Sequence, residues 1–180
     1  MAPISKNKKH WTSLVIFVLV MAVMVTLNLL LLNYNHNEKW FDTLKPAFAP
    51  THNIFGTIYT AIYAFIAIAG WCVFIAPAKK SQSIRQHQKA LKDKVSFPFL
   101  IPMALLAINL VLNLIWAILF FYFHLLEWSF AEILILWICC FALALAFFRI
   151  RSLAGILLLP YLGWVSFLTL INLSMWRLNS

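Results

Sequence analysis

Hydrophobic residues form five long, nearly unbroken runs along the chain, separated by short polar segments. The runs cover residues 12–32, 53–76, 99–122, 129–148 and 153–175. Each run has about 20 residues or more, which is the length that a helix needs to cross the hydrocarbon core of a bilayer. Continuous rather than alternating hydrophobicity favours helices, because in lipid each backbone polar group must be satisfied within its own segment. The pattern therefore predicts an all-α protein, a bundle of five transmembrane helices forming a single domain.

The composition supports a membrane protein over other classes. Of the 180 residues, 64% are hydrophobic and 11% are charged, and the mean hydropathy is +0.90. An average soluble domain is about half apolar and about a quarter charged. The chain therefore lacks the polar side chains to cover a water-soluble globule. Disorder is also excluded, because disordered chains combine low hydrophobicity with high charge. We expect the lipid bilayer to be its surroundings.

The first hydrophobic run follows a basic tail, as a signal peptide would. However, the apolar stretch spans residues 12–32, and no A-x-A-like cleavage site precedes Asn33. A signal peptide has a shorter apolar region followed by such a site. We therefore expect the first run to be an uncleaved transmembrane helix.

Positive charge is distributed unevenly between the two ends of the predicted bundle. The net charge of +9 comes from lysines in the N-terminal tail, from the loop 77–97, and from Arg149 and Arg151. With five spans these three segments share one side, and the loops on the other side are balanced in charge. Because basic loops stay in the cytoplasm, we predict a cytoplasmic N-terminus, a cytoplasmic loop 77–97 and an external C-terminus. The basic charge is then a topology signal, and no nucleic-acid partner is expected.

Polar residues inside spans are costly and count as functional candidates. Glu132 is the one acidic residue within a predicted span, and either a structural or a functional role is open for it. Asn109, Asn113 and Trp116 recur at helical spacing and share one face of the third span. This face either lines a cavity or bonds to neighbouring helices.

Tryptophans divide into a set near the span boundaries and a deeper set. The boundary set is explained by an interfacial aromatic belt and consists of Trp11, Trp40, Trp128 and Trp176. Trp116 and Trp164 lie deeper, where a belt explains them less well. The deeper pair is therefore the better candidate for contact with a ligand.

Small residues form stripes on two spans. Gly56, Thr60 and Ala64 lie on one face of the second span, and Ala142 and Ala146 on one face of the fourth. Such stripes let helices approach closely, either within the bundle or between two copies of the chain.

Motifs for metal binding and hydrolytic chemistry are not found. His52 and His124 fall at the ends of spans without the paired spacing of metal ligands. Cys139 and Cys140 are adjacent and Cys72 is isolated, so all three read as small apolar residues. No Ser-His-Asp pattern, phosphate loop or pair of carboxylates is present. We therefore expect no metal, no resident cofactor and no hydrolytic activity.

Several motifs, taken together and in order, resemble the TspO/MBR family of tryptophan-rich sensory proteins, the relatives of the mitochondrial translocator protein. The first loop reads WFDTLKPAFAP over 40–50 and is followed by FGTIY over 55–59. The third span reads NLVLNLIWAILFF over 109–121. The fifth reads LPYLGWVSF over 159–167 and ends in WRLN over 176–179.

This resemblance implies a ligand pocket that opens toward the first loop and is enclosed by the five helices. It also implies that the ligand is a porphyrin such as protoporphyrin IX, with haem as a further possibility, that the chain forms a homodimer, and that it lies in a bacterial inner membrane or, alternatively, the mitochondrial outer membrane. The ligand-binding residues implied by the matching motifs are His52, Tyr59, Asn113, Trp116, Trp128, Trp164, Phe167 and Leu168.

The chain departs from the family pattern at a few positions. Phe48 and Thr51 replace a Trp and a Pro of the first loop, and Tyr59 stands where the family usually has Trp. Light-dependent porphyrin degradation in the family is linked to a Trp at the position of Tyr59. The resemblance therefore implies a receptor rather than an enzyme. Leu173 occupies the place of the Tyr in the sterol-recognition pattern, so sterol binding is not expected. A transporter of porphyrins or other amphiphiles, or a light-dependent porphyrin-degrading enzyme, is the alternative.

Overall fold

The computed structural model describes residues 4–33, 37–84 and 100–179, with side chains at 11–33, 39–51, 54–76 and 100–179. This part of the chain is helical and has no strand. Its elements are α1 (Ile4–Leu32), α2 (Asn37–Leu44), α3 (His52–Ile84), α4 (Leu100–Ala117), the π-helix η2 (Ile118–Tyr122), α5 (Leu126–Ile150) and α6 (Ser152–Asn179).

Five of these helical segments are long and apolar enough to cross a membrane, as predicted. The spans are Trp11–Leu32, Ile54–Ala76, Leu100–Tyr122, Leu126–Ile150 and Ser152–Asn179. The chain is thus an all-α, multi-pass membrane protein, in contact with the lipid bilayer. The predicted limits lie within a few residues of these spans, except that α5 begins earlier and α6 continues further.

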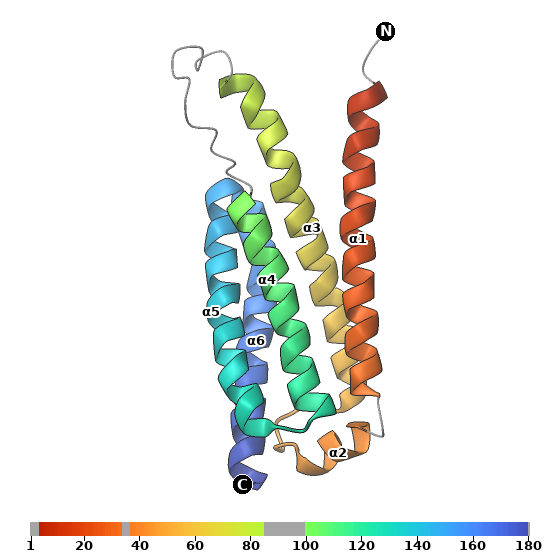
Figure 1. Ribbon diagram of the computed structural model, residues 1–180, viewed down its shortest axis with the longest axis vertical. Helices are drawn as coiled ribbons and strands as arrows, with labels where there is room; N and C mark the ends of the chain where they lie inside the picture. The colour runs from red at the N-terminus through yellow and green to blue at the C-terminus, as the bar shows by residue number, and fades with distance from the viewer. Residues whose placement is uncertain (1–3, 34–36, 85–99, 180) are drawn as a thin grey trace.

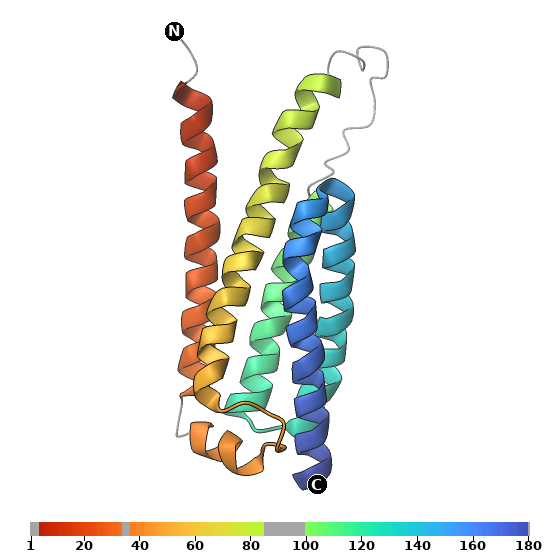
Figure 2. The ribbon, with the colours of Figure 1, turned by 180° about the vertical axis from the view of Figure 1, so that it is seen from behind.

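The five long helices run side by side as a bundle (Figures 1 and 2), and their contacts close into a ring. Going round it, α1 packs against α3, α3 against α6, α6 against α5, α5 against α4, and α4 against α1 again. Sequence neighbours are therefore not always spatial neighbours. Helix α3 packs mainly against α1 and α6 and only slightly against α4. This order brings the second and fifth predicted spans together, which matters for the site below.

The interior of the ring is filled by large apolar side chains. Fully buried members include Ile66 and Val73 of α3, Ile133 and Leu143 of α5, and Val165 of α6. Outward-facing positions of the same helices carry exposed apolar side chains. This arrangement is favourable in a membrane, because the outer apolar side chains contact lipid chains and not water.

Two glycines allow close contact that a larger residue would prevent. A Cβ at Gly70 would lie 2.8 Å from the Phe17 ring of α1 and 3.2 Å from Leu106 of α4. A Cβ at Gly155 would overlap the ring of Phe148 across the turn between α5 and α6. Gly70 thus lets α1, α3 and α4 meet at one point.

The predicted small-residue stripe on the second span has two different surroundings. A Cβ at Gly56 would lie 3.0 Å from Leu29 of α1, so Gly56 serves packing within the bundle. Thr60 and Ala64 are exposed, and Thr60 donates its hydroxyl to the Gly56 carbonyl of its own helix. Close approach at Gly56 is therefore internal, and a homodimer through this stripe stays a prediction.

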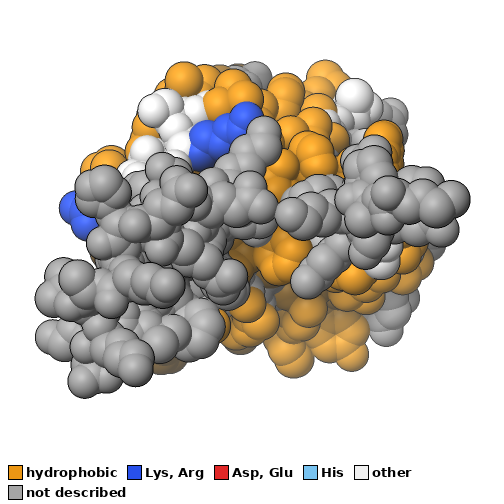
Figure 3. Space-filling model, turned by 90° about the horizontal axis from the view of Figure 1, so that it is seen from above, with side chains coloured by type: hydrophobic (Ala, Val, Ile, Leu, Met, Phe, Trp, Pro, Cys, Tyr) orange, Lys and Arg blue, Asp and Glu red, His pale blue; other side chains and the backbone are white. Residues whose placement is uncertain are grey.

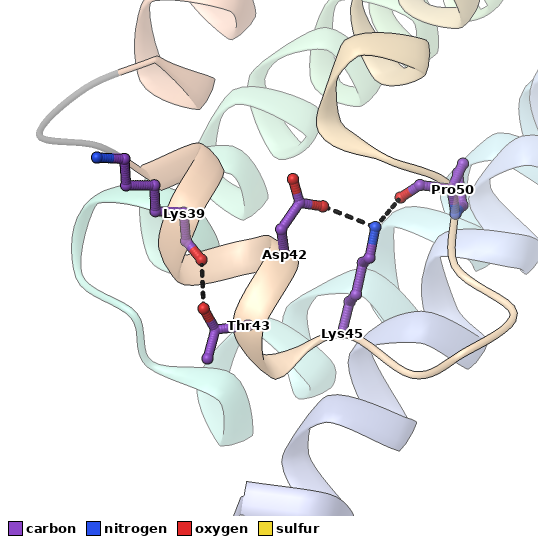
Figure 4. A network of polar contacts seen from close by, with 5 residues as sticks. All are labelled: Lys39, Asp42, Thr43, Lys45 and Pro50. Atoms are coloured by element: carbon purple, nitrogen blue, oxygen red, sulfur yellow. Dashed lines mark hydrogen bonds and ion pairs between the residues drawn. The ribbon is translucent and has the colours of Figure 1, made fainter.

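The short helix α2 lies across one end of the ring, beneath the ends of α1, α3 and α4 (Figure 1). Hydropathy did not predict this helix, because its eight residues mix charged and apolar side chains. The Phe41 side chain is buried and fixes α2 to the bundle. Beyond α2, the ammonium group of Lys45 contacts Asp42 at 2.7 Å and donates to the Pro50 carbonyl at 3.4 Å (Figure 4).

The start of α1, the end of α3 and the α5–α6 turn lie at the opposite end of the bundle (Figure 1). Figure 3 looks onto this end, where the described basic residues of the α5–α6 turn are Arg149 and Arg151. The N-terminal lysines and most of the loop 77–97 lie outside the described residues or side chains. The helix ends that flank the three basic segments thus lie at one end of the bundle, as predicted. The compartment that this end faces stays a prediction.

Candidate functional site

Aromatic side chains from α3 and α6 meet at the end of the bundle that α2 covers. The indole of Trp164 in α6 lies edge-on to Phe55 at 5.3 Å and to Tyr59 at 5.9 Å, both in α3. One turn further along α6, Phe167 lies 5.7 Å from Trp164. These contacts follow from the helix order, because only α3 and α6 as neighbours bring the two faces together.

The first loop extends this aromatic region. Phe41 of α2 lies edge-on to Phe55 at 5.0 Å, and Phe48, after α2, lies 6.2 Å from Phe167. Phe48 is exposed, whereas Phe41 is buried. The segment from α2 to Pro50 therefore covers the aromatic residues of α3 and α6, and its own aromatic side chains belong to the same group.

A second aromatic group lies on the α4 side of the ring. Trp116 stacks on Phe120 at 5.1 Å and lies edge-on to Phe121 at 5.9 Å. The π-helix η2 carries both phenylalanines, and both are buried. Phe120 reaches Trp40 of α2 at 5.5 Å, so α2 touches both groups.

The ring nitrogen of Trp116 is satisfied by a neighbouring helix. In the amide orientation of Asn172 that satisfies its partners, the oxygen accepts from Trp116 Nε1 at 3.2 Å and from the Ser129 hydroxyl at 3.0 Å. The amide nitrogen then donates to the Leu126 carbonyl at 3.0 Å. Trp116 is only 1% exposed, so it serves as a connection between α4, α5 and α6.

The asparagines of α4 bond to tyrosines on other helices. The Tyr63 hydroxyl of α3 donates to Asn113 Oδ1 at 2.6 Å and accepts from Asn28 Nδ2 of α1 at 3.2 Å. The Tyr161 hydroxyl of α6 donates to Asn109 Oδ1 at 2.8 Å. Of the two roles left open for this face, helix–helix bonding is therefore observed for Asn109 and Asn113.

A small number of buried polar atoms have no hydrogen-bond partner among the described residues. They are the Tyr59 hydroxyl, Trp164 Nε1, Asn109 Nδ2 and both carboxyl oxygens of Glu132. Buried polar groups are paired in the large majority of cases, so each exception needs a reason. Tyr59 and Trp164 stand out because their rings are in contact and both lie in the aromatic region below the first loop.

The structure brings some of the predicted site residues together and separates others. Tyr59, Trp164 and Phe167 form one contiguous region, and Leu168 is buried beside them in α6. Asn113 and Trp116 are also buried, but Asn113 Oδ1 and Trp116 Nε1 are engaged by Tyr63 and Asn172. Trp128 is 66% exposed on the outside of the bundle, and the side chain of His52, at the start of α3, lies outside the described part.

The sequence reasoning did not include Phe41 and Phe55 among the site residues. Both are buried, and their rings lie between Trp164 and the second aromatic group. Phe55 occupies one of the recognised motifs, which is the signal that could have indicated it. Phe41 belongs to α2, whose presence hydropathy does not indicate.

Metal ligands do not cluster in the part of the chain that the structure describes. No three histidine, cysteine, aspartate or glutamate side chains there come close enough to hold a metal ion. The three cysteines are free thiols.

These features define a five-helix integral membrane protein with an aromatic region at one end of its interior. The profile of the TspO/MBR family matches residues 13–177. The chain belongs to this family, as its motifs indicated.

Named relatives from bacteria and animals match most of the chain. Protein CrtK of Rhodobacter capsulatus is 26% identical over 141 residues, which cover 78% of each chain. The tryptophan-rich protein TspO of Chlorobaculum tepidum is 30% identical over 142 residues, covering 78% of this chain and 80% of its own. The human translocator protein is 26% identical over 147 residues, covering 80% and 78%.

Proposed function

We propose that this protein is a membrane receptor that binds a flat tetrapyrrole, of the protoporphyrin IX kind, between α3 and α6 beneath the first loop. The observation that carries the proposal is a pair of adjacent buried donors, the Tyr59 hydroxyl and Trp164 Nε1, for which the described residues offer no partner within hydrogen-bond distance. A buried donor without a partner costs free energy unless a ligand satisfies it. Two such donors in contact therefore favour a ligand that presents acceptor atoms at this place.

The side chains around the two donors suit a planar aromatic molecule. Phe55, Phe167 and the rings of Tyr59 and Trp164 offer faces and edges for stacking. Ligand sites are typically lined by aromatic side chains with a few polar groups that fix orientation. A porphyrin provides a broad apolar face, and its carboxylates provide acceptors, so it meets both requirements.

The names of the relatives agree with a binding or sensing role without specifying the ligand. The Cereibacter sphaeroides relative, 27% identical over 143 residues, is called a tryptophan-rich sensory protein. Because several relatives are bacterial, we propose the bacterial inner membrane as the location. The proposed orientation places the basic end of the bundle in the cytoplasm and the aromatic end outside.

Titration with protoporphyrin IX tests the proposal. Purified protein in detergent is expected to show saturable quenching of tryptophan emission, together with a shift of the porphyrin absorption band. Empty micelles and free tryptophan in micelles provide the control for porphyrin that merely partitions into detergent. Quenching that rises without saturation, and equally in the control, would contradict the receptor proposal.

A second candidate function is transport, and Glu132 is the observation that favours it. This side chain is 8% exposed, and both its oxygens lack a partner among the described residues. A buried carboxyl within a membrane span is a common element of proton-coupled transport. Glu132 belongs to α5, whereas the aromatic region is formed by α3 and α6.

The Glu132→Gln variant distinguishes transport from binding alone. Glutamine keeps the size of the side chain but cannot carry a proton or a charge. For a transporter, porphyrin accumulation driven by a pH gradient in proteoliposomes should be lost, while the dissociation constant in detergent is unchanged. Equal accumulation by the variant and the native protein would leave transport without its coupling residue. We expect the binding constant to be the same in both proteins.

A further inference from the structure

A surface hollow lies at the covered end of the bundle, outside the aromatic region described above. It has a volume of about 280 Å³ and is formed by the turn before α5, the first turn of α5 and the last turn of α6. Its lining residues are His124, Leu125, Leu126, Glu127, Trp128, Trp176 and Asn179. The proposed receptor site uses none of these residues, and Trp128, which the family motifs implied as a ligand residue, is exposed outside that site.

Two indoles form the aromatic part of this hollow. Trp128 is 66% exposed, so its ring is available from outside the protein. Trp176 is held by Phe130, whose ring lies 5.7 Å away in a tilted arrangement. One indole is thus fixed by packing and the other is accessible, which gives a wall on which a ligand can lie.

A carboxylate completes the hollow. Glu127 Oε1 accepts a hydrogen bond from Trp176 Nε1 at 3.3 Å, which orients the carboxylate toward the indole. Glu127 forms no ion pair with any residue that the structure describes there. An ionised group that is oriented yet lacks a counter-charge favours a cationic ligand.

The other titratable lining residue does not cancel this charge. Partial burial lowers the pKa of His124 below its ordinary value of 6.5, so the imidazole is neutral near pH 7. Its ring stacks on Trp40 of α2 at 4.2 Å, which fixes its position. At neutral pH, Glu127 is therefore the charged residue among those lining the hollow.

Aromatic faces together with a carboxylate are the features that recognise ammonium groups. A cation is attracted to the face of tryptophan, and quaternary ammonium ligands are bound in this way in other proteins. An anionic group is disfavoured because it would face Glu127. The exposed Arg177, also in the last turn of α6, is a cation of the kind that a lipid phosphate contacts.

The position of the hollow identifies the source of the ammonium group. Its residues lie at the ends of the spans Leu126–Ile150 and Ser152–Asn179, where a bilayer changes from hydrocarbon to headgroups. Exposed apolar side chains next to it, such as Tyr122 and Phe123, suit the acyl region of a lipid. We propose that this hollow binds the ammonium headgroup of a zwitterionic phospholipid, with Glu127 as its counter-charge and Trp128 and Trp176 as its aromatic wall.

Lipid competition followed by native mass spectrometry tests this proposal without involving porphyrin. Protein purified in an uncharged maltoside detergent is incubated with equal amounts of phosphatidylcholine and phosphatidylglycerol that carry the same acyl chains. We expect phosphatidylcholine to be retained at least about fivefold over phosphatidylglycerol, in keeping with a cation–aromatic contact and a counter-charge. Glu127→Gln and Trp128→Ala should each bring this ratio close to one.

The matched control is Trp11→Ala. It removes a tryptophan of similar exposure at the start of the span Trp11–Leu32, at the end of the bundle away from the hollow. Trp11 is 64% exposed, and its loss should leave the lipid preference unchanged. Glu127 lies in the first turn of α5, where its negative charge also stabilises the helix through the helix dipole. Losing that stabilisation would lower the melting temperature but would not change the choice of lipid. Measuring both for Glu127→Gln separates the two roles.

Several outcomes would overturn the proposal. One is equal retention of the two lipids by the native protein, and another is a lipid preference that survives Glu127→Gln. A third is displacement of the phospholipid by choline chloride at a concentration equal to that of the lipid. That result would show that a free organic cation, and not a lipid, is the ligand of the hollow.

Discussion

Replacing Trp164 by alanine is expected to weaken protoporphyrin IX binding by at least about tenfold. The indole contacts Phe55, Tyr59 and Phe167, and its N–H is one of the two donors that lack a partner among the described residues. The substitution therefore removes both a stacking surface and a hydrogen-bond donor, which together account for more than one factor of ten. The dissociation constant should be followed by the porphyrin absorption band, because the variant lacks one of the emitting tryptophans.

Two further variants show whether the loss is specific to this site. Trp137→Ala also removes an indole from the bundle, but Trp137 bonds to Ser166 and stacks on Phe141, outside the candidate site. We expect the native affinity for this control. Trp164→Phe keeps an aromatic ring and removes the N–H, so its affinity should lie between those of the native protein and Trp164→Ala. Equal losses in Trp164→Ala and Trp137→Ala would mean that the effect is general loss of packing.

Replacing Trp116 by alanine is expected to lower the free energy of unfolding by about 3–5 kcal/mol, the range for a large aromatic residue in a core. Trp116 is almost fully buried, stacks on Phe120 and donates to Asn172. Its loss leaves a cavity between α4, α5 and α6 and removes the donor that Asn172 accepts from. Denaturation in detergent, followed by circular dichroism, measures this change.

The controls for Trp116 separate its packing from its hydrogen bond. Trp116→Phe keeps a ring on Phe120 but loses the N–H and part of the buried volume, so it should cost about 2 kcal/mol, less than Trp116→Ala. Trp128→Ala removes an exposed indole and should leave stability nearly unchanged. If Trp116→Ala were as stable as the native protein but failed to bind porphyrin, Trp116 would be a ligand residue and not a structural one.

Hydropathy alone was sufficient for the five spans, because lipid requires long continuous apolar segments. It could not indicate α2, whose short sequence NEKWFDTL mixes charged and apolar residues in two turns. The stability of α2 comes from Phe41 inserting between Phe55 and Phe120, a contact between distant parts of the chain. No local pattern records such a contact.

The candidate site was only partly predictable for a related reason. Spacing along one helix placed Asn113 and Trp116 correctly on one buried face, but it could not tell whether the face binds a ligand or another helix. That depended on Tyr63 and Asn172, which come from α3 and α6. The contact between Tyr59 and Trp164 likewise requires that α3 and α6 be neighbours, which hydropathy does not determine.

Trp128 shows the opposite case, in which a motif and a simpler pattern disagreed. Its position near a span boundary indicated an interfacial belt, whereas the family motif implied a ligand contact. The structure places its side chain on the outside, in agreement with the boundary position. Its proposed role with a lipid headgroup is compatible with that exposed place.

The most direct test of the receptor site is the thermal shift caused by protoporphyrin IX in the double variant Tyr59→Phe, Trp164→Phe. Each position keeps an aromatic ring, although phenyl is smaller than indole, and the two donors that lack a partner among the described residues are removed. Removing two buried donors without partners offsets the packing lost with the smaller ring at position 164, so the ligand-free variant should melt close to the temperature of the native protein. The increase in melting temperature on adding porphyrin should be largely lost, whereas the native protein should show a clear increase. A variant that retains the full porphyrin-induced shift would contradict the claim that these two donors recognise the ligand.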